Sequence, residues 1–425
     1  MRRIVLVGSV ATAILTVVAC ASTGDDPPAP SPDAESPAPT PDASEREVVV
    51  GSDAGPEARA PLCSADGWCE TLLPDGDLFL RDVWPFPDRA FAIADSATVG
   101  IRVLEWTRED STWRYIDDNS QNEALAESAS KIWAPNVDEV YYSAGPAMIY
   151  HGTRPVPPAT AWTWRSERLP DNSPEGAPGM TADQKRMALG VWGTGKGDVY
   201  AWYSNTIFHR KIGDAGAVSW VPEYIVDDPD TAAQRLLIVG AAGTRADDVW
   251  FSGVRYEDNY ACNVVVRKTS GSYQRIADGV QQDALWLPCT ARADVPLLLA
   301  GSESQWPQQF QSQDGQRFLI GGDVQQIAPE GDGGYAVSRT SLSSRVWRTF
   351  WTDPDDRLWA GANLTDDGWG VVVRADIGAD AGEYQYSRTA RNGAPAAGTI
   401  AQIRGTSATN IWLVGDRHAI HKTTP

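Results

Sequence analysis

The sequence predicts an all-β fold built from repeated sheets. Beyond about residue 62, short runs rich in Val, Ile, Trp and Tyr alternate with Gly, Asp, Asn, Ser and Pro, as in strands joined by turns. One phrase recurs at 193–200, 243–250 and 405–412: Gly-Thr, three variable residues, Asp or Asn, a β-branched residue and an aromatic residue. Gly and Asp or Asn suit turn dihedrals, and the last two residues suit a pleated, half-buried strand. Copies at fixed internal spacing indicate a repeat fold.

The aromatic residue that closes the phrase measures the repeat. Sharp or degenerate copies place it at Phe91, Tyr141, Tyr200, Trp250, Trp359 and Trp412. The successive gaps are 50, 59, 50, 109 and 53 residues, so we place one further unit inside the long gap, at the apolar run 297–300. The resulting seven units of about 50 residues can each hold a four-stranded sheet. Such sheets arranged radially form a β-propeller, here seven-bladed. The strand-like run 335–339 leaves eight blades as the alternative.

The strands of one unit are clearest in the third. We expect them at 189–193, 199–203, 206–211 and 218–224. No long segment shows the 3.6-residue apolar period of a helix. Only two short helices are expected, within 121–131 and 181–188.

The two ends of the repeat region are incomplete in complementary ways. The last unit has strands expected at 403–405, 411–414 and 419–422, and the chain ends at Pro425 before a fourth strand. Residues 68–73 have strand character but no sheet of their own. We therefore predict that this N-terminal strand completes the last blade, which closes the ring and covers an open sheet edge.

Residues 1–19 have the features of a signal peptide, with Arg2 and Arg3 before an apolar stretch that is short for a permanent membrane span. The stretch ends in Val-Val-Ala followed by Cys20, which resembles the lipobox of bacterial lipoproteins. That resemblance implies cleavage before Cys20 and diacylation of its sulfur, which would anchor the protein firmly. Ala21 resembles the residue of an outer-membrane sorting signal in Gram-negative bacteria. The alternative is an ordinary secretory signal followed by a cysteine by chance.

Residues 20–61 predict a disordered tether. They are rich in Pro, Ala, Ser, Asp and Glu and carry few large apolar side chains, so they cannot bury enough surface to fold. Their proline runs favour polyproline II, in which forty residues at about 3.1 Å each extend on the order of 100 Å. Such a segment would hold the folded part, expected at 62–425, away from a membrane.

The other cysteines predict two disulfides. With Cys20 assigned to lipid, Cys63, Cys69, Cys262 and Cys289 remain, and an even number in an exported protein favours disulfides. Cys63 and Cys69 are close in sequence at the start of the folded part, so we expect Cys63–Cys69 and Cys262–Cys289. Free buried thiols are the alternative. No CxxC or Cys/His ligand spacing is present, which argues against a zinc site.

The acidic balance excludes two partner classes. Net charge is −20, from 36 basic and 56 acidic residues. Nucleic-acid binding needs a basic face, and electrostatic docking on anionic lipid needs basic clusters. We expect neither, and we expect membrane contact only through the lipid anchor.

The four histidines do not predict a catalytic or metal site. His151, His209 and His421 follow the repeat aromatic by nine or ten residues, at the end of the expected third strand. Equivalent positions in a ring lie far apart, so we expect a structural histidine with a hydrogen-bond partner at each. His418 is expected on the surface, in a tight loop. Nucleophile elbows, P-loops, HExxH and EF-hand motifs do not occur. We therefore expect no catalytic residues, no metal and no cofactor.

Candidate ligand-binding residues lie in the longer loops between expected second and third strands, at 254–260, 302–306 and 363–369. They are Tyr256, Glu257, Asp258, Tyr260, Trp306, Asp366, Asp367 and Trp369. Aromatic faces beside carboxylates suit stacking and hydrogen bonding to sugars, and they equally suit a protein surface. Plain solvated loops are the alternative.

The repeat phrase resembles repeats in bacterial exported lipoproteins with β-propeller heads, of myxobacterial type. The sequence-based hypothesis is a monomeric, membrane-tethered extracytoplasmic propeller at the outer membrane or cell surface. It would bind a protein or glycan partner of the envelope and perform no chemistry. The alternative is a carbohydrate-active hydrolase or lyase that uses carboxylates on the axial loop face.

Overall fold

The computed structural model describes residues 63–123, 127–213, 216–257, 260–280, 289–295, 310–311, 314–320, 323–331, 333–341, 347–363, 370–376, 384–387, 389–391, 394–395 and 398–424. The predicted signal peptide, Cys20 and the predicted tether lie outside these residues. All described strands belong to one compact unit, Arg59–Pro425. Within the described ranges, no helix is long and apolar enough to cross a membrane.

The described residues form six four-stranded sheets, one five-stranded sheet and a two-stranded ribbon. Two neighbouring sheets consist of β2 (Phe79–Pro85), β3 (Arg89–Ser96), β4 (Gly100–Thr107) and β5 (Trp113–Tyr115), and of β6 (Ser128–Asn136), β7 (Glu139–Gly145), β8 (Met148–Thr153) and β9 (Thr163–Arg168). The next two consist of β10 (Leu189–Gly195), β11 (Asp198–Tyr203), β12 (Thr206–Ile212) and β13 (Val218–Ile225), and of β14 (Arg235–Arg245), β15 (Asp248–Glu257), β16 (Tyr260–Thr269), β17 (Ser272–Val280) and β18 (Thr290–Ala291).

Two further sheets follow, and a short ribbon comes after them. The sheets consist of β19 (Phe310–Gln311), β20 (Arg317–Ile320), β21 (Asp323–Pro329) and β22 (Tyr335–Ser341), and of β23 (Trp347–Thr352), β24 (Arg357–Asn363), β25 (Gly370–Asp376) and β26 (Tyr384–Ser387). The ribbon pairs β27 (Ala390–Arg391) with β28 (Ala394–Pro395).

The last sheet joins the two ends of the unit. It contains β29 (Ile400–Ser407), β30 (Asn410–Gly415) and β31 (His418–Lys422), and its outer strand is β1 (Trp68–Glu70). β1 pairs antiparallel with β31, with Trp68 opposite Lys422. The predicted completion of the last sheet by an N-terminal strand is confirmed. The disulfide Cys63–Cys69, also as predicted, lies at this junction.

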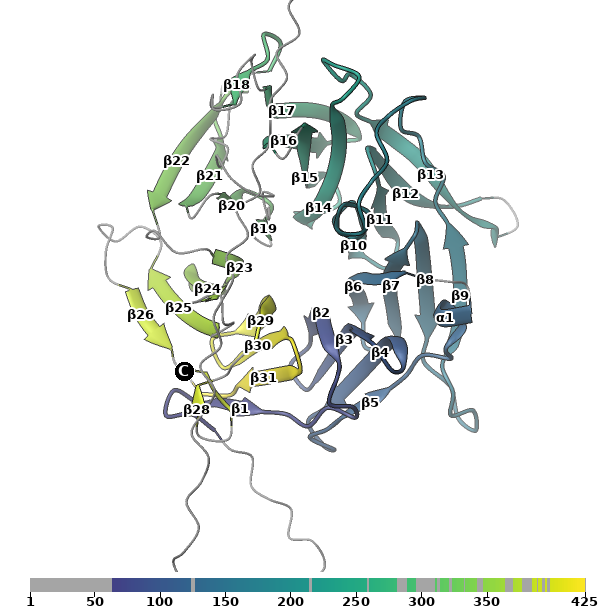
Figure 1. Ribbon diagram of the computed structural model, residues 1–425, viewed down its shortest axis with the longest axis vertical. Helices are drawn as coiled ribbons and strands as arrows, with labels where there is room; N and C mark the ends of the chain where they lie inside the picture. The colour runs from purple at the N-terminus through teal and green to yellow at the C-terminus, as the bar shows by residue number, and fades with distance from the viewer. Residues whose placement is uncertain are drawn as a thin grey trace, which may run out of the picture. The chain divides into compact units, whose positions relative to one another are not determined.

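Figure 1 shows the sheets side by side around a centre, with β2, β6, β10, β14, β19, β23 and β29 innermost. Within each sheet the strands follow one another outward in chain order, apart from β1. This is an all-β propeller, as the sequence predicts. The hydrophobic clusters lie between neighbouring sheets: one of them combines Trp133 and Ile149 of one sheet with Val191 and Phe208 of the next.

Four details of the sequence prediction can be compared with the structure. The helix expected within 121–131 is only α1 (Ser120–Glu123), and β6 begins at Ser128, because burying Ile132 and Trp133 against neighbouring sheets outweighs a weak local helix preference. The second helix is confirmed as α2 (Ala182–Met187), with a capping box formed by Thr181 and Gln184. The run 297–300 lies outside the described residues. The run 335–339 belongs to β22, the outer strand of the sheet that begins with β19.

The repeated phrase forms a bulged hairpin at the same place in each sheet. The register shifts between Gly193 and Gly195, between Gly243 and Arg245, and between Gly405 and Ser407. Gly193 does not have positive φ, so its freedom of dihedral angle is not what the site requires. A Cβ there would lie 2.4 Å from the Asp198 carbonyl oxygen and 2.9 Å from the Trp133 ring of the preceding sheet. Gly193 is therefore needed for the close approach of the partner strand and of the Trp133 ring, whereas Gly243 in the second copy also has a positive φ of 154°.

The other polar residues of the phrase satisfy one another. Thr194 Oγ1 donates to Asp198 Oδ2 at 2.5 Å, and Asp198 Oδ1 lies 3.0 Å from His209 Nε2. The His209 ring stacks on Tyr200, with centroids 4.4 Å apart. In the last sheet, Asn410 and His421 form the same contact at 2.8 Å. The prediction of a structural histidine with a hydrogen-bond partner is confirmed for His209 and His421. At His151 the nearest carboxylate oxygen, Oε2 of Glu139, lies 3.6 Å from Nε2, too far for a hydrogen bond.

His418 is not where the sequence predicts. It is 2% exposed and begins β31, and its Nδ1 lies 2.8 Å from the Asp416 carbonyl oxygen. Only two residues separate β30 from β31. His418, the first residue of β31, therefore lies close to the end of β30 and packs beside Gly398 and Gly415.

Candidate functional site

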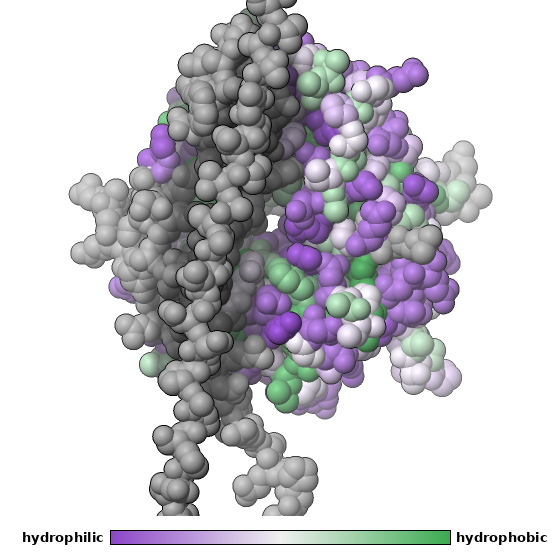
Figure 2. Space-filling view, viewed as in Figure 1, coloured by the Kyte–Doolittle hydropathy of each residue, from purple (hydrophilic) through white to green (hydrophobic). Residues whose placement is uncertain are grey.

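The candidate site lies at one end of the sheets, which we call the loop face. It is the end at which second strands finish and third strands begin, at Tyr203 and Thr206 in one sheet and at Glu257 and Tyr260 in the next. The opposite end carries the repeat-phrase turns, and we call it the phrase face. The described surface in Figure 2 is mainly hydrophilic, with hydrophobic residues scattered over it.

The structure places only part of the predicted ligand-binding set. Tyr256 and Glu257 end β15 at the loop face, and both are partly buried. Tyr260 begins β16, and its side chain is outside the described part. The remaining five predicted residues lie outside the described residues: Asp258, Trp306, Asp366, Asp367 and Trp369.

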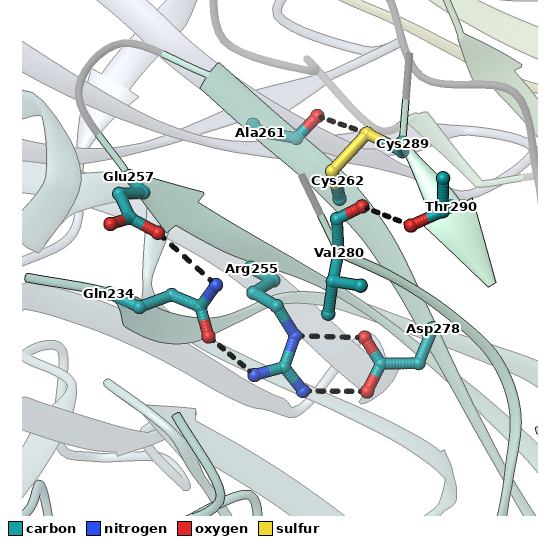
Figure 3. The surroundings of a disulfide bond; sticks show 9 residues. All are labelled: Gln234, Arg255, Glu257, Ala261, Cys262, Asp278, Val280, Cys289 and Thr290. Atoms are coloured by element: carbon teal, nitrogen blue, oxygen red, sulfur yellow. Dashed lines mark hydrogen bonds and ion pairs between the residues drawn. A yellow bond between two sulfur atoms is a disulfide. The ribbon is translucent and has the colours of Figure 1, made fainter. Parts of the chain in front are cut away.

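The Glu257 carboxylate anchors a loop. It accepts hydrogen bonds from Thr231 Oγ1 at 2.9 Å and from Gln234 Nε2 at 3.4 Å, and both donors precede β14. Gln234 is 5% exposed, and its side-chain oxygen accepts from Arg255 Nη1 at 2.7 Å (Figure 3). Glu257 therefore continues a hydrogen-bonded chain that starts in the sheet interior.

Arg255 is the centre of that chain. Its side chain, 2% exposed, makes a two-pronged ion pair with Asp278 of β17, with N–O distances of 3.0 and 2.7 Å (Figure 3). Its Nη1 also donates to the Asp228 carbonyl oxygen at 2.9 Å. A buried arginine needs such complete pairing, since a charge removed from water is costly when unpaired.

Two more arginines complete a balanced network. Arg275 Nη1 lies 2.9 Å from Asp228 Oδ2, and Arg292 Nη1 lies 3.0 Å from Asp230 Oδ1. Burial alone would raise the pKa of Asp228, but the hydrogen bond from Arg275 and the charges of Arg255 and Arg292 hold it below its usual value. Together with Arg255 and Asp278, the network has three arginines and three aspartates.

A disulfide fixes the outer side of this network. Cys262 of β16 is bonded to Cys289, as predicted, across the intervening strand β17 (Figure 3). The next residue, Thr290, opens β18 and donates to the Val280 carbonyl oxygen at 3.0 Å. The bond thereby holds residues 289–295 against the sheet and brings Arg292 to the aspartates.

A depression opens beside this network, between the sheet β10–β13 and the sheet β14–β18. It is small: the space in it that a water-sized molecule can occupy is about 10 Å³, roughly room for one water molecule. Its lining combines apolar side chains with polar ones, principally Pro174, Val226, Leu236, Ser173, Asn205 and Arg235. Arg235 lies directly opposite Tyr256 in the strand register, so the depression adjoins the predicted ligand-binding residues.

Most polar groups in the depression are already bonded within the protein. Asn205 Nδ2 donates to the Val226 carbonyl oxygen at 2.9 Å, and the hydroxyls of Ser173 and Ser204 share a hydrogen bond of 2.6 Å. Arg235 differs. It is 8% exposed, and within the described ranges its guanidinium makes no hydrogen bond and no ion pair. Burial lowers its pKa, opposed by the charges of Asp171 and Tyr203.

The structure shows no metal-binding cluster in its described ranges: no group of three or more His, Cys, Asp or Glu side chains could hold an ion there. The histidines of this repeat position lie in separate sheets at the phrase face, each beside a carboxylate or amide of its own sheet. They do not contribute to the depression.

Comparison with known proteins gives a fold. No family model and no curated protein matches the chain. Among solved structures, a streptogramin B lyase superimposes with a TM-score of 0.52 at 12% identity, covering 83% of this chain and 96% of its own. The fold is a β-propeller. A catalytically inactive virginiamycin B lyase from Staphylococcus aureus with quinupristin gives 0.51 at 14% identity, covering 84% and 99%.

A further solved structure is not described as an enzyme. The protein YCF48, bound to a D1 peptide, superimposes with a TM-score of 0.51 at 13% identity, covering 86% of this chain and 99% of its own. Lyases and a peptide-bound protein thus share this fold at similar distances from the chain. Fold alone therefore does not separate catalysis from binding, and the site must decide.

Sequence reasoning missed Arg235. It precedes the apolar run 236–239 and looks like an ordinary strand-flanking charge. What distinguishes Arg235 is that its side chain has no partner within the described residues, and this depends on how two sheets and a distant loop pack together. No sequence signal reports that.

Proposed function

We propose that the chain is a non-enzymatic recognition protein whose propeller binds an envelope or extracellular partner at the loop face, around Tyr256, Glu257 and Arg235. The observation that carries the proposal is the division of roles there. The described carboxylates around the depression are bonded to neighbouring groups that hold loops, while the buried cation Arg235 has no partner in the described ranges. A group left without an internal partner is available for an external one.

The same observation weighs against the alternative of a carbohydrate-active hydrolase or lyase. Such enzymes place two carboxyl groups roughly 5–10 Å apart across a cleft, one of them with a raised pKa. Asp228 instead has a lowered pKa, and Asp278 is fully buried in its ion pair. Neither has the environment of a general acid.

We propose further that the protein is exported and lipid-anchored through Cys20, with residues 20–61 as the tether. The two disulfides support export, because such bonds persist in oxidising compartments. The anchor and the outer-membrane location rest on the lipobox resemblance and on Ala21. We also infer seven blades, with the five-stranded sheet counted as a blade beside the six four-stranded sheets.

The recognition proposal is tested by thermal shift on the full chain purified in detergent. A panel of peptides, neutral and acidic oligosaccharides and envelope polysaccharides is titrated, since a ligand of the folded state raises the melting temperature with concentration. Tyr256→Ala should abolish the shift. Lys196→Ala, at an exposed position on the phrase face, should leave it intact.

Each saccharide is also incubated with the protein and analysed for shorter products. Cleavage would replace the recognition proposal with the carbohydrate-active alternative. A shift that survives Tyr256→Ala but is lost with Lys196→Ala would move the site to the phrase face.

A further inference from the structure

We propose that Arg235 is an anion receptor, and that its ligand is a carboxylate on an apolar peptide segment of a protein partner. The inference rests on the recognition function proposed above and names the partner class. It follows from three observations: Arg235 has no side-chain partner within the described residues, the depression beside it is largely apolar, and the guanidinium group is planar.

The first step is the missing partner. Arg235 is 8% exposed, and within the described ranges none of its side-chain N–H groups has a protein acceptor. Its neighbour in the same sheet, Arg255, is 2% exposed and fully paired. None of the Arg235 nitrogens is among the buried side-chain atoms without a partner, so its guanidinium group reaches solvent. An incoming anion can therefore meet its five N–H donors without displacing a partner within the described residues.

The second step is the lining. A glycan site needs several polar groups free to bond hydroxyls, but Asn205 and Ser173 already bond within the protein, and Gln234 bonds Arg255 and Glu257. Among the described residues, one cation, Arg235, remains without a partner beside Pro174, Val226 and Leu236. A single cation with apolar walls suits an acidic residue flanked by apolar residues. Arginine beside apolar and aromatic groups is also typical of protein-interface hot spots.

The third step is the charge of the anion. The planar fork of a guanidinium matches a carboxylate with two parallel hydrogen bonds. Asp171 lies near enough to influence the pKa of Arg235. One cation in such surroundings suits a monoanion better than a phosphate dianion. The proposed ligand is therefore an Asp or Glu side chain or a chain-terminal carboxylate.

The test uses the full chain in detergent and an array of fluorescent peptides with Asp or Glu between Leu, Val or Pro. Each acidic peptide is matched by its Asn or Gln counterpart, and hexagalacturonate represents acidic glycans. We expect the best acidic peptide to bind at least about tenfold more tightly than its amide counterpart, as a charge-assisted pair provides. Arg235→Met should abolish that preference. Arg235→Lys should keep part of it, because the charge remains and the fork does not.

Arg245→Met is the matched control, since Arg245 is exposed in a turn at the opposite, phrase face, and it should not change the preference. Melting temperature without ligand is the second readout. If Arg235 is a receptor, Arg235→Met melts at about the parent temperature, because the side chain has no hydrogen bond within the described residues to lose. If Arg235 is a structural residue, the variant melts lower.

The outcomes separate the two proposals. Equal binding of acidic and amide peptides by the parent, or unchanged preference in Arg235→Met, overturns the receptor and leaves recognition standing. Binding of hexagalacturonate alone overturns the protein partner and leaves recognition standing. Failure of the parent to bind any probe overturns both.

Discussion

The phrase face and the loop face differ in how their polar side chains are hydrogen-bonded. At the phrase face, the same threonine, acidic or amide residue and histidine recur, and they bond one another in separate sheets. At the loop face of the sheets β10–β13 and β14–β18, the residues are specific to one place. Arg255 is saturated with partners there, and Arg235 has none in the described ranges. Repetition in this molecule thus accompanies structural roles, and the candidate site is found where the repeat is broken.

The pair Arg255 and Arg235 gives the sharpest form of this comparison. Both are buried arginines of adjoining strands at one end of one sheet. Arg255→Met should lower stability by about 3–5 kcal/mol, because Asp278 keeps its burial and loses its two-pronged partner. Arg235→Met should not lower it. Denaturant unfolding of the two variants measures the difference.

Asp278→Asn is the control for the first variant. It removes the opposite charge of the same pair, so it should also destabilise the protein, and Arg255→Met combined with Asp278→Asn should cost less than the two changes added together. Equal stability losses in Arg255→Met and Arg235→Met would remove the distinction between the two arginines.

The disulfides test how the loop face is held. Replacing Cys262 and Cys289 by serine should cost about 3–4 kcal/mol, because the bond closes a loop with a sequence separation of 27 residues. The corresponding change at Cys63 and Cys69, with a separation of 6, should cost about 2 kcal/mol. Loss of Cys262–Cys289 should also release Arg292 from Asp230, seen as faster hydrogen exchange in 289–295. Unchanged exchange there would show that the ion pairs suffice to hold the segment.

The fold could be predicted from the sequence because its signals are local and repeated. Each copy of the phrase contains residues that favour a turn followed by a strand. The last sheet lacks a fourth strand at the C-terminal end, and the extra N-terminal strand supplies it, as the pairing of Trp68 with Lys422 shows. The prediction was wrong where one copy gave too little local signal. His418 looked like a loop residue because nothing in the sequence reports that its turn is tight enough to bury it.

The site could be predicted only in part. Tyr256 and Glu257 were selected by loop length and composition, and the structure places them beside the depression. The role of Glu257 as an anchor depends on Thr231 and Gln234, which reach it through the connection between two sheets. Arg235 lacks a side-chain hydrogen bond or ion pair within the described residues because packing brings no acceptor to it there. Both are properties of tertiary packing, which the sequence does not display.

The phrase itself can be tested with two glycines of one copy. Gly193→Ala should cost about 3 kcal/mol, since its Cβ would lie 2.4 Å from a backbone oxygen that cannot move without disturbing the hairpin. Gly195→Ala, with no neighbouring atom within 4 Å of the added carbon, should change stability by less than about 1 kcal/mol. Chemical denaturation compares the two. Similar costs would mean that the phrase glycine is selected for turn formation rather than for close packing.

The smallest expected effect is the pH response of the phrase-face histidines. Burial, with the charge of Arg108, lowers the pKa of His421 to about 4, below the usual value of about 6.5 in an unfolded chain. The unfolded state therefore binds the proton first, so the stability due to neutral His421 is complete above about pH 6.5 and is lost as pH falls toward 4. Between pH 7 and pH 5 the loss is about 2 kcal/mol.

His421→Gln isolates this contribution, because glutamine keeps a donor for Asn410 and does not titrate. Its stability should fall by about 2 kcal/mol less than that of the parent between pH 7 and pH 5. Burial also lowers the pKa of His151 to about 4. Replacing His151 by glutamine in the His421→Gln variant should therefore reduce the dependence of stability on pH further. If stability changes equally with pH in the parent and the variant, His421 can be protonated in the folded state while it stays stacked on Trp412. The phrase face would then be less rigid than its repeated hydrogen bonds imply.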